Sequence, residues 1–547
     1  MIFLTDHLPI LPVAIPLFTG ALILLTKDTH RLVRLLLTGV ALLGQLWVAL
    51  RLLSFTSGAI PSNWPDGIGV YLLGSWQAPF GIVAVVDRLT VVMLLLTAVL
   101  GIAAWSYALA RWDRRGVHFH ALLQFLLMGL NGAFLTGDLF NLFVFFEVLL
   151  VASYGLMLHG SGKTRVASGL HYIAVNLIAS FILLIALAII YGLTGTLNMA
   201  DLTVKVGTLA QGDQQLFKTG IALLSIAFLI KAAAWPLNFW LPATYANSSA
   251  PVAGIFTIMT KVGIYALLRI GSLLQGTEAL AAVSGQWMFI VGLTTLAFAS
   301  IGLLAAAQIE RQAGYGIIMS SGILLTAFGY PGGLLTGPAL FYMVSSVLAL
   351  GAFYLLVEMI HRTQPFGAEM LAASLEMFDL DDPEAPDQSD DVIGIAIPAA
   401  MAFLGMAFFA CALLIAGLPP LSGFIAKFAL ISYALEGLSN GNYQAHTWLL
   451  VGGILLSGLA GLIALTRTGI RLFWSSEEVT IPRLRVIEAS PVAALISGCI
   501  ALTVWAGPVM NYLEDTAHYL QQPEAYVGAV LNKNNDETQQ IPVRGQP

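Results

Sequence analysis

The sequence predicts an all-α polytopic membrane protein with about 14 transmembrane helices, and three observations lead to this fold class. Of 547 residues, 58% are hydrophobic and only 10% are charged, whereas soluble domains average about 25% charged residues. The mean hydropathy is +0.85. The apolar residues form runs of about 20, the length that a helix needs to cross about 30 Å of hydrocarbon. These runs lack the strand-like alternation that a membrane β-barrel would show.

Fourteen such runs follow one another along the chain. Their centres lie near residues 17, 42, 95, 127, 149, 181, 225, 260, 293, 321, 348, 412, 457 and 498. The first run contains three prolines and has no basic segment before it, so we interpret it as a span rather than a cleavable signal. The transmembrane bundle is therefore expected to occupy residues 1–507, followed by a polar C-terminal tail at 508–547.

Lysine and arginine are distributed unevenly between the two sets of alternate loops. One set carries 14 of the 24 basic residues and the opposite set carries 7. Because short cytoplasmic loops are enriched in Lys and Arg, we expect the richer set in the cytoplasm of a bacterial cell and both termini outside. The remaining three basic residues are Lys231, Lys261 and Lys427, which lie inside apolar runs.

One hydrophilic segment interrupts the bundle. Residues 363–392 contain nine Asp or Glu residues and no Lys or Arg. The simpler interpretation is a solvated cytoplasmic loop within the bundle. The alternative is a docking surface for a partner subunit or a vestibule that attracts cations.

Several classes of protein are excluded. The chain has no basic domain for nucleic acid, no phosphate-binding loop, no nucleotide or flavin motif, and no His/Cys spacing typical of a metal site. Cys411 and Cys499 both lie in apolar runs, so we interpret them as packing residues. We therefore expect no cofactor, no metal and no enzymatic activity.

Four ionisable residues inside apolar runs are the strongest indication of function. Each costs about 2.5–3.5 kcal/mol at a helix centre facing lipid, so these residues must pair with one another or line a wet cavity. Glu147, in FNLFVFFEVLLVASYG, has apolar neighbours on its own helix. Its partner must come from another helix, either as a structural ion pair or as a relay whose partner moves.

The three buried lysines lie near polar residues or helix-breaking prolines. Lys231 precedes Pro236 in FLIKAAAWPLNFWLP, where helical spacing would place Trp235 and Asn238 on its face. Burial disfavours an ammonium ion and a nearby carboxylate favours it, so such a lysine can load and release a proton near neutral pH. The alternative for each lysine is a purely structural ion pair.

The other two lysines have comparable surroundings. Lys261, in GIFTIMTKVGIYALLR, belongs to a polar stripe with Thr257 and Tyr265, which suits a hydrated path. Lys427 follows Pro419 and Pro420 in AGLPPLSGFIAKFALI. Two proline-broken helices far apart in the chain indicate an internal repeat with ion sites at the breaks.

Three of these segments resemble one known family. FEVLLVASYGLM, FLIKAAAWPLNFWLPATYANSSAPVAGIFTIMTKVGIYALLR and GLPPLSGFIAKFALI are similar to the proton-conducting membrane transporters, which include the antiporter-like subunits of respiratory complex I and the large subunits of Mrp-type antiporters. The resemblance covers roughly residues 80–470. It implies two inverted five-helix repeats, at about 117–272 and 280–467, with helices 7 and 12 broken.

The resemblance also implies roles for the ionisable residues. Glu147 would pair with Lys231, Lys261 would be the central lysine, and Lys427 would lie at the exit of a proton path. The sequence departs from the family where relatives often carry His or Lys, because here Ser320, Ser345, Ser346 and Leu350 occupy the corresponding helices. The path between Lys261 and Lys427 would therefore need water held by hydroxyl groups.

Within the family, the chain most resembles the D-type branch of the large Mrp antiporter subunits. Its length, its short tail, its acidic insert and a lysine rather than a glutamate at 427 favour this branch. The resemblance implies exchange of Na⁺ or K⁺ for H⁺, serving pH and sodium homeostasis, together with other membrane subunits. The alternatives are a proton-pumping subunit of complex I, a membrane-bound hydrogenase subunit, and a non-transporting scaffold.

Overall fold

The chain is almost entirely helical wherever its structure is described. The computed structural model describes residues 7–27, 30–61, 64–116, 118–331, 333–362, 399–439, 444–473 and 484–538. The α-helices are α2 (Leu11–Leu25), α3 (Arg31–Thr56), α4 (Arg88–Ala108), α5 (Phe119–Leu135), α6 (Leu139–Met157), α7 (Lys163–Thr194), α8 (Met199–Val206), α9 (Gln211–Lys231), α10 (Leu241–Asn247), α11 (Ala250–Phe256), α12 (Met259–Leu273), α13 (Gln286–Ala305), α14 (Ile309–Phe328), α15 (Thr336–His361), α17 (Ala399–Ala416), α18 (Ser422–Ser439), α19 (Gln444–Phe473), α20 (Val486–Val504), α21 (Ala506–Leu520) and α22 (Pro523–Thr538). Short 3₁₀ turns lie at Leu8–Ile10, Pro65–Gly67, Leu73–Ser75, Trp112–Arg114 and Glu278–Ala282.

The prediction of a helical membrane protein is confirmed. In the described ranges, twelve helical segments are long and apolar enough to cross a membrane. The two expected centres outside these twelve segments, near 127 and 321, fall on α5 and α14. The α5 helix is apolar but has only 17 residues. The count of fourteen spans therefore stays a prediction.

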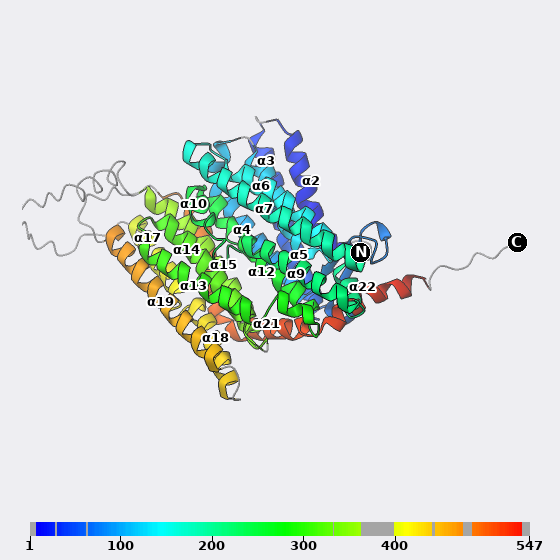
Figure 1. Ribbon diagram of the computed structural model, residues 1–547. Helices are drawn as coiled ribbons and strands as arrows, with labels where there is room; N and C mark the ends of the chain where they lie inside the picture. Colours follow the sequence, from blue (N-terminus) through cyan, green and yellow to red (C-terminus); the bar gives the residue numbers. More distant parts are fainter. Residues whose placement is uncertain are drawn as a thin grey trace, which may run out of the picture.

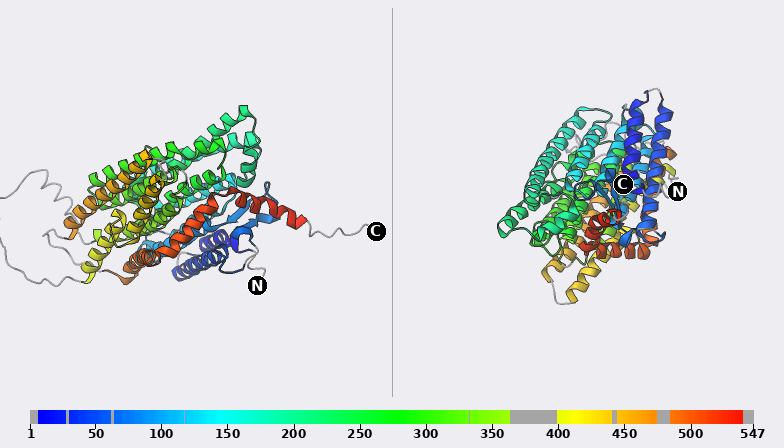
Figure 2. Two further views of the ribbon diagram at one scale, coloured as in Figure 1. Left: turned by 90° about the horizontal axis from the view of Figure 1, so that it is seen from below. Right: turned by 90° about the vertical axis from the view of Figure 1, so that its right-hand side faces the viewer.

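The helices form a bundle whose two halves lie side by side. Helices α2 to α9 occupy one side, and α13, α14 and α17 to α19 occupy the other (Figure 1). The views in Figure 2 show the same arrangement. The α15 helix packs against both halves, and its most apolar window is completely buried. Its side chains therefore lie between the two halves of the bundle.

Two helices in the middle of the bundle are interrupted. The chain leaves helical geometry between α9 and α10 and between α17 and α18, next to the prolines that predicted these breaks. Between α11 and α12, residues 257 and 258 keep right-handed helical dihedral angles, so Ala250–Leu273 forms one helical segment with a tightened turn. There the hydroxyl of Thr257 donates to the Gly254 carbonyl at 2.8 Å.

Smaller elements cover the ends of the bundle. Strands β1 (Gly69–Leu72) and β2 (Val83–Val86) pair antiparallel, with Gly69 opposite Val86 and Leu72 opposite Val83. The described part of the polar tail forms α21 and α22, which run across one end of the bundle (Figure 1). Cys411 and Cys499 are buried and unoxidised. The acidic segment 363–392 lies outside the described residues.

Candidate functional site

The α9 helix ends at Lys231, deep in the bundle. The side chain is buried, and its Nζ lies 5.5 Å from the centre of the Phe146 ring on α6. The α12 helix approaches closely at Gly263, where a Cβ atom would lie 2.5 Å from the Phe228 carbonyl oxygen and 3.2 Å from Lys231 Cβ. A cation at the end of a helix is favoured by the negative end of the helix dipole.

The segment after Lys231 is held by a neighbouring helix. The backbone N–H of Trp235 donates to the hydroxyl of Thr295 on α13 at 2.9 Å. Asn238 is buried, and its Nδ2 has no hydrogen-bond partner among the described residues. The expectation of one face for Lys231, Trp235 and Asn238 is wrong, because the helix ends at Lys231 and the Trp235 side chain is 42% exposed.

Glu147 lies on α6, next to Phe146. Its carboxylate is near enough to act electrostatically on Lys231, but no direct ion pair joins the two in the described structure. One carboxylate oxygen, Oε1, is buried without a hydrogen-bond partner among the described residues. The pair that the family resemblance implies is therefore open in this conformation.

Lys261 lies on α12, just after the tightened turn at residues 257–258. The side chain is fully buried, and its Nζ donates to the Ser321 hydroxyl on α14 at 3.3 Å. The other two members of the expected polar stripe bond to backbone carbonyls, Thr257 as described above and Tyr265 to Phe134 at 2.6 Å.

Pairs of serine hydroxyls connect the helices between Lys261 and Lys427. Ser320 on α14 donates to Ser346 on α15 at 2.9 Å, and Ser345 on α15 lies 2.8 Å from the Ser422 hydroxyl at the start of α18. A cavity of about 10 Å³ beside Ser345 and Ser346 is also lined by Leu350. Its wall is mostly apolar, but its size and the two serine hydroxyls suit about one ordered water molecule.

Lys427 completes the series on α18. Its buried Nζ donates to the carbonyls of Ile415 and Ala416 at 3.0 and 2.9 Å. These are two of the last carbonyls of α17, which the helix itself leaves unpaired. The break at Pro419 and Pro420 folds the start of α18 back, so that the lysine reaches the end of α17. This lysine, like Lys231, lies at the negative end of a helix.

Two residues of this series, Ser321 and Ser422, were not predicted from the sequence. Each had a local signal, because Ser321 adjoins Ser320 and Ser422 follows the double proline. Neither signal specifies a partner on another helix. The contacts of Ser321 with Lys261 and of Ser422 with Ser345 depend on how α12, α14, α15 and α18 pack.

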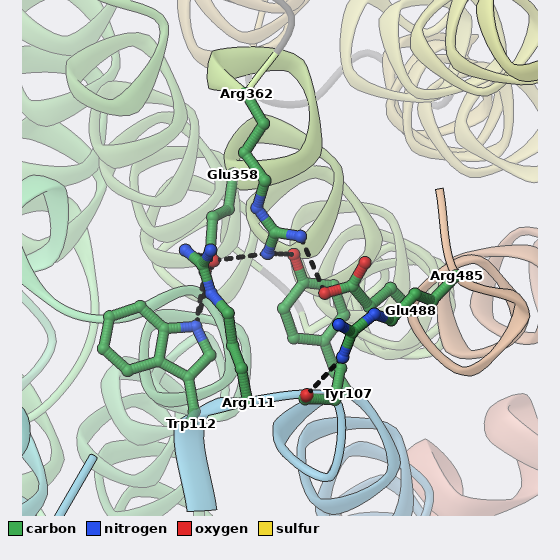
Figure 3. Close-up of polar contacts among 8 residues, drawn as sticks. Tyr107, Arg111, Trp112, Glu358, Arg362, Arg485 and Glu488 are labelled. Carbon is green, nitrogen blue, oxygen red and sulfur yellow. Dashed lines mark hydrogen bonds and ion pairs between the residues drawn. The ribbon is translucent and has the colours of Figure 1, made fainter. Parts of the chain in front are cut away.

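A charged cluster at one end of the bundle, drawn in Figure 3, was not predicted from the sequence either. Glu358 near the end of α15 accepts from Arg111 at 2.8 Å and from Arg362 at 2.6 Å, and from the indole N–H of Trp112. Arg362 also pairs with the buried Glu488 of α20 at 2.7 Å. The cluster ties together the ends of α4, α15 and α20. We call this end of the bundle the arginine-rich face.

Together, the fold and the buried series define a polytopic membrane protein with ionisable side chains buried between its helices. A family model described as NADH:quinone oxidoreductase/Mrp antiporter, TM, matches residues 136–459. The chain belongs to this family.

Relatives and solved structures agree with this assignment. The chain is 49% identical over 539 residues to the D subunit of a probable K(+)/H(+) antiporter of Rhizobium meliloti, covering 96% of this chain and 98% of the relative. It is 32% identical to the D subunit of a Na(+)/H(+) antiporter of Alkalihalophilus pseudofirmus, covering 96% and 100%. These relatives place the chain among transporters rather than enzymes.

Two solved structures share the fold. A chain of the Mrp complex from Dietzia matches with a TM-score of 0.79 at 26% identity, covering 96% of this chain and 99% of that one. A chain of respiratory complex I from Thermus thermophilus matches with a TM-score of 0.71 at 19% identity, covering 95% and 99%. The second likeness concerns the fold alone.

Proposed function

We propose that this chain is the D-type subunit of a multisubunit antiporter that exchanges Na⁺ or K⁺ for H⁺ and supports pH and sodium homeostasis. It acts in the bacterial inner membrane beside other membrane subunits. Its arginine-rich face is cytoplasmic and both termini are outside. The names of the relatives support the exchange of a monovalent cation for a proton.

The observation that carries the proposal is the buried series from Glu147 to Lys427. Lys231 and Lys427 lie at the negative ends of helices, which favour a cation, and the fully buried Lys261 lies on α12 and donates to Ser321 of α14. Serine hydroxyls and about one water molecule connect the central lysine to Lys427. A proton can therefore pass from lysine to lysine along this series.

Glu147 acts as the regulator of this path. A carboxylate close to Lys231 favours its charged form, and a carboxylate held away does not. The open arrangement of Glu147 and Lys231 corresponds to a state in which Lys231 can release its proton. Closing the pair would load Lys231 from the adjacent helix break, where Asn238 offers an unpaired amide.

The breaks also support the repeat architecture. Two inverted five-helix repeats, at about 117–272 and 280–467, would each contain one proline-associated break, between α9 and α10 and between α17 and α18. The total of fourteen spans belongs to the same proposal. Broken helices near the membrane midplane are a common way to build ion sites in transporters.

The test is cation-induced collapse of a pH gradient in inverted membrane vesicles. The vesicles carry the complete set of subunits in a strain without other antiporters, and Na⁺ and K⁺ are added separately. Wild type is compared with Lys231→Ala and with Lys218→Ala. Lys218 is a matched control on the same helix, because it forms an exposed ion pair with Glu278.

The proposal predicts that Lys231→Ala abolishes the cation response and that Lys218→Ala preserves it, at equal amounts of assembled complex. A response that survives in Lys231→Ala would identify the chain as a scaffold. A wild-type complex that ignores cations and acidifies vesicles only with NADH and a quinone would instead indicate a complex I subunit.

A further inference from the structure

A second series of buried polar side chains lies between α2, α3 and α5. On α5 these are His120, Gln124 and Asn131, and on α3 they are Thr38 and Gln45, none more than 4% exposed. Spacings of four and seven residues place each set on one face of its helix. Over its eleven residues, the α5 set rises about 16 Å, roughly half the hydrocarbon thickness.

Hydrogen bonds join the two sets. The ring Nδ1 of His120 lies 3.2 Å from the Thr38 hydroxyl. Further along, the Gln45 amide donates to Gln124 at 3.3 Å, and Asn131 donates to Gln45 at 3.2 Å. The polar groups therefore form a ladder rather than isolated buried sites.

A proline in α2 provides the last acceptor of the ladder. Pro16 lies inside α2 and has no N–H, so the carbonyl of Pro12 has no helical donor. The Asn131 amide donates to this carbonyl at 2.8 Å. The same amide bonds to both Pro12 and Gln45, which fixes the orientation of the Asn131 side chain.

Three atoms of the ladder have no hydrogen-bond partner among the described residues. They are Nε2 of His120, Nε2 of Gln124 and Oδ1 of Asn131, all buried. A buried polar atom without a partner costs about 1–3 kcal/mol. Because three such atoms lie along one face of α5, we infer that water molecules occupy the space beside the ladder and bond to them.

The ladder begins at a hollow on the arginine-rich face. The hollow has about 780 Å³ of open space, its mouth included, and His120 lies in its wall. Its other charged residues are Arg31, Arg34, Asp113, Arg114 and Arg115. The unpartnered atoms of the ladder are amide and imidazole groups, to which water can donate or from which it can accept, so we take the occupant of the ladder to be water.

Apolar side chains close the opposite end. Leu52 lies one heptad beyond Gln45 on α3, Leu135 lies one turn beyond Asn131 on α5, and Leu8 lies one turn before Pro12. All three are buried in one apolar cluster with residues of α4 and β2. We call Leu8, Leu52 and Leu135 the apolar plug.

The ladder faces away from the lysine series. The opposite side of α5 packs on α6, where Cβ atoms at Gly129 and Gly132 would touch Leu149 and Phe145. The two paths therefore lie on different sides of α5. Nothing in the lysine mechanism uses the ladder.

We propose that α2, α3 and α5 enclose a water-filled half-channel that admits protons from the arginine-rich face to the level of Asn131, where the apolar plug stops them. The plug then serves as the barrier that keeps this path from short-circuiting the pH gradient. This role is independent of the antiport reaction.

The test is passive proton permeability of vesicles that carry the complete complex, measured as the decay of an imposed pH gradient without Na⁺ or K⁺. Leu52→Asn places a polar group in the plug. Leu50→Asn is the control, because Leu50 lies on α3 at nearly the same depth but is 47% exposed. Leu135→Asn opens the plug from α5 and serves as a second variant if Leu52→Asn fails to assemble.

The half-channel predicts a several-fold faster decay in the plug variants than in wild type or Leu50→Asn. Adding Asn131→Leu to a plug variant should restore the slow decay, since it removes the polar group next to the plug. Unchanged decay in assembled plug variants would overturn the proposal. Fast decay that persists with Asn131→Leu would also overturn it, because the leak would then bypass the ladder.

Discussion

Replacing Gly417 by alanine should weaken both the fold and transport, because this glycine makes room for Lys427. Gly417 ends α17 with a φ of +78°. An added Cβ would lie 2.4 Å from Lys427 Cδ and 3.1 Å from its Nζ. The lysine would have to move away from the carbonyls of Ile415 and Ala416, which it now caps.

The magnitude follows from two contributions. A non-glycine residue in left-handed geometry costs roughly 1 kcal/mol. Loss of hydrogen bonds from a charged group costs about 1.5–3 kcal/mol. Together, about 3 kcal/mol is a substantial part of the 5–15 kcal/mol that is typical of folded proteins. We expect Gly417→Ala to lower the midpoint of thermal inactivation and the rate of cation-driven proton exchange.

The assay heats vesicles that contain the assembled complex and then measures the intact subunit and the exchange rate. Gly405→Ala is the matched control, since Gly405 lies inside α17 and its Cβ would meet nothing within 4 Å. In a helix interior this change should be neutral or stabilising. Equal thermal midpoints and equal exchange rates for the two variants would refute the role assigned to Gly417.

Three further predictions test other parts of the structure. Thr295→Val removes the acceptor that holds the break after α9 and should lower stability by about 1–3 kcal/mol in the same heating assay, whereas an unchanged midpoint would show that the break is held elsewhere. Ser346→Ala should slow exchange about 2–10-fold through the loss of one hydroxyl in the path without changing the amount of assembled complex, and an unchanged rate would exclude this serine. Burial opposes ionisation of Asp87, between β2 and α4, but its ion pair with Arg269 at 2.6 Å holds the pKa of Asp87 below its usual range. Because the pKa of Asp87 is lower in the folded protein than its unfolded-state value of about 4, the ion pair stabilises the fold above that pH. This stabilisation is lost as the pH falls. Thermal stability should therefore drop below about pH 4 in wild type but not in Asp87→Asn, and parallel pH profiles would contradict the assignment.

The sequence was informative wherever a single residue type imposes a physical cost. Each span centre that was expected from the long apolar runs falls on a helix. Pro236, Pro419 and Pro420 predicted two of the breaks, because proline removes a helical hydrogen bond. Buried lysines could be recognised from their apolar neighbours alone, since a charge in lipid must be compensated.

Features that depend on packing between distant helices were not predictable in the same way. The tightened turn before Lys261 has no proline to mark it in the sequence and is recognisable only from the structure, where the Thr257 hydroxyl bonds to the Gly254 carbonyl. In the charged cluster, Glu358 contacts Arg111 and Trp112, which lie more than 240 positions earlier in the sequence. Glu147 was expected to pair with Lys231, but side-chain distance depends on conformation and no sequence pattern specifies it.

The central claim is that protons cross this chain through its buried lysines. The most direct measurement is proton release from proteoliposomes containing the purified complex after a jump in external Na⁺ or K⁺, because each entering cation is exchanged for a leaving proton. Lys261→Met should be compared with wild type, because Lys261 is the fully buried centre of the series. We expect the variant to assemble but to show no cation-driven proton release. Proton release from the assembled variant at the wild-type rate would contradict this claim.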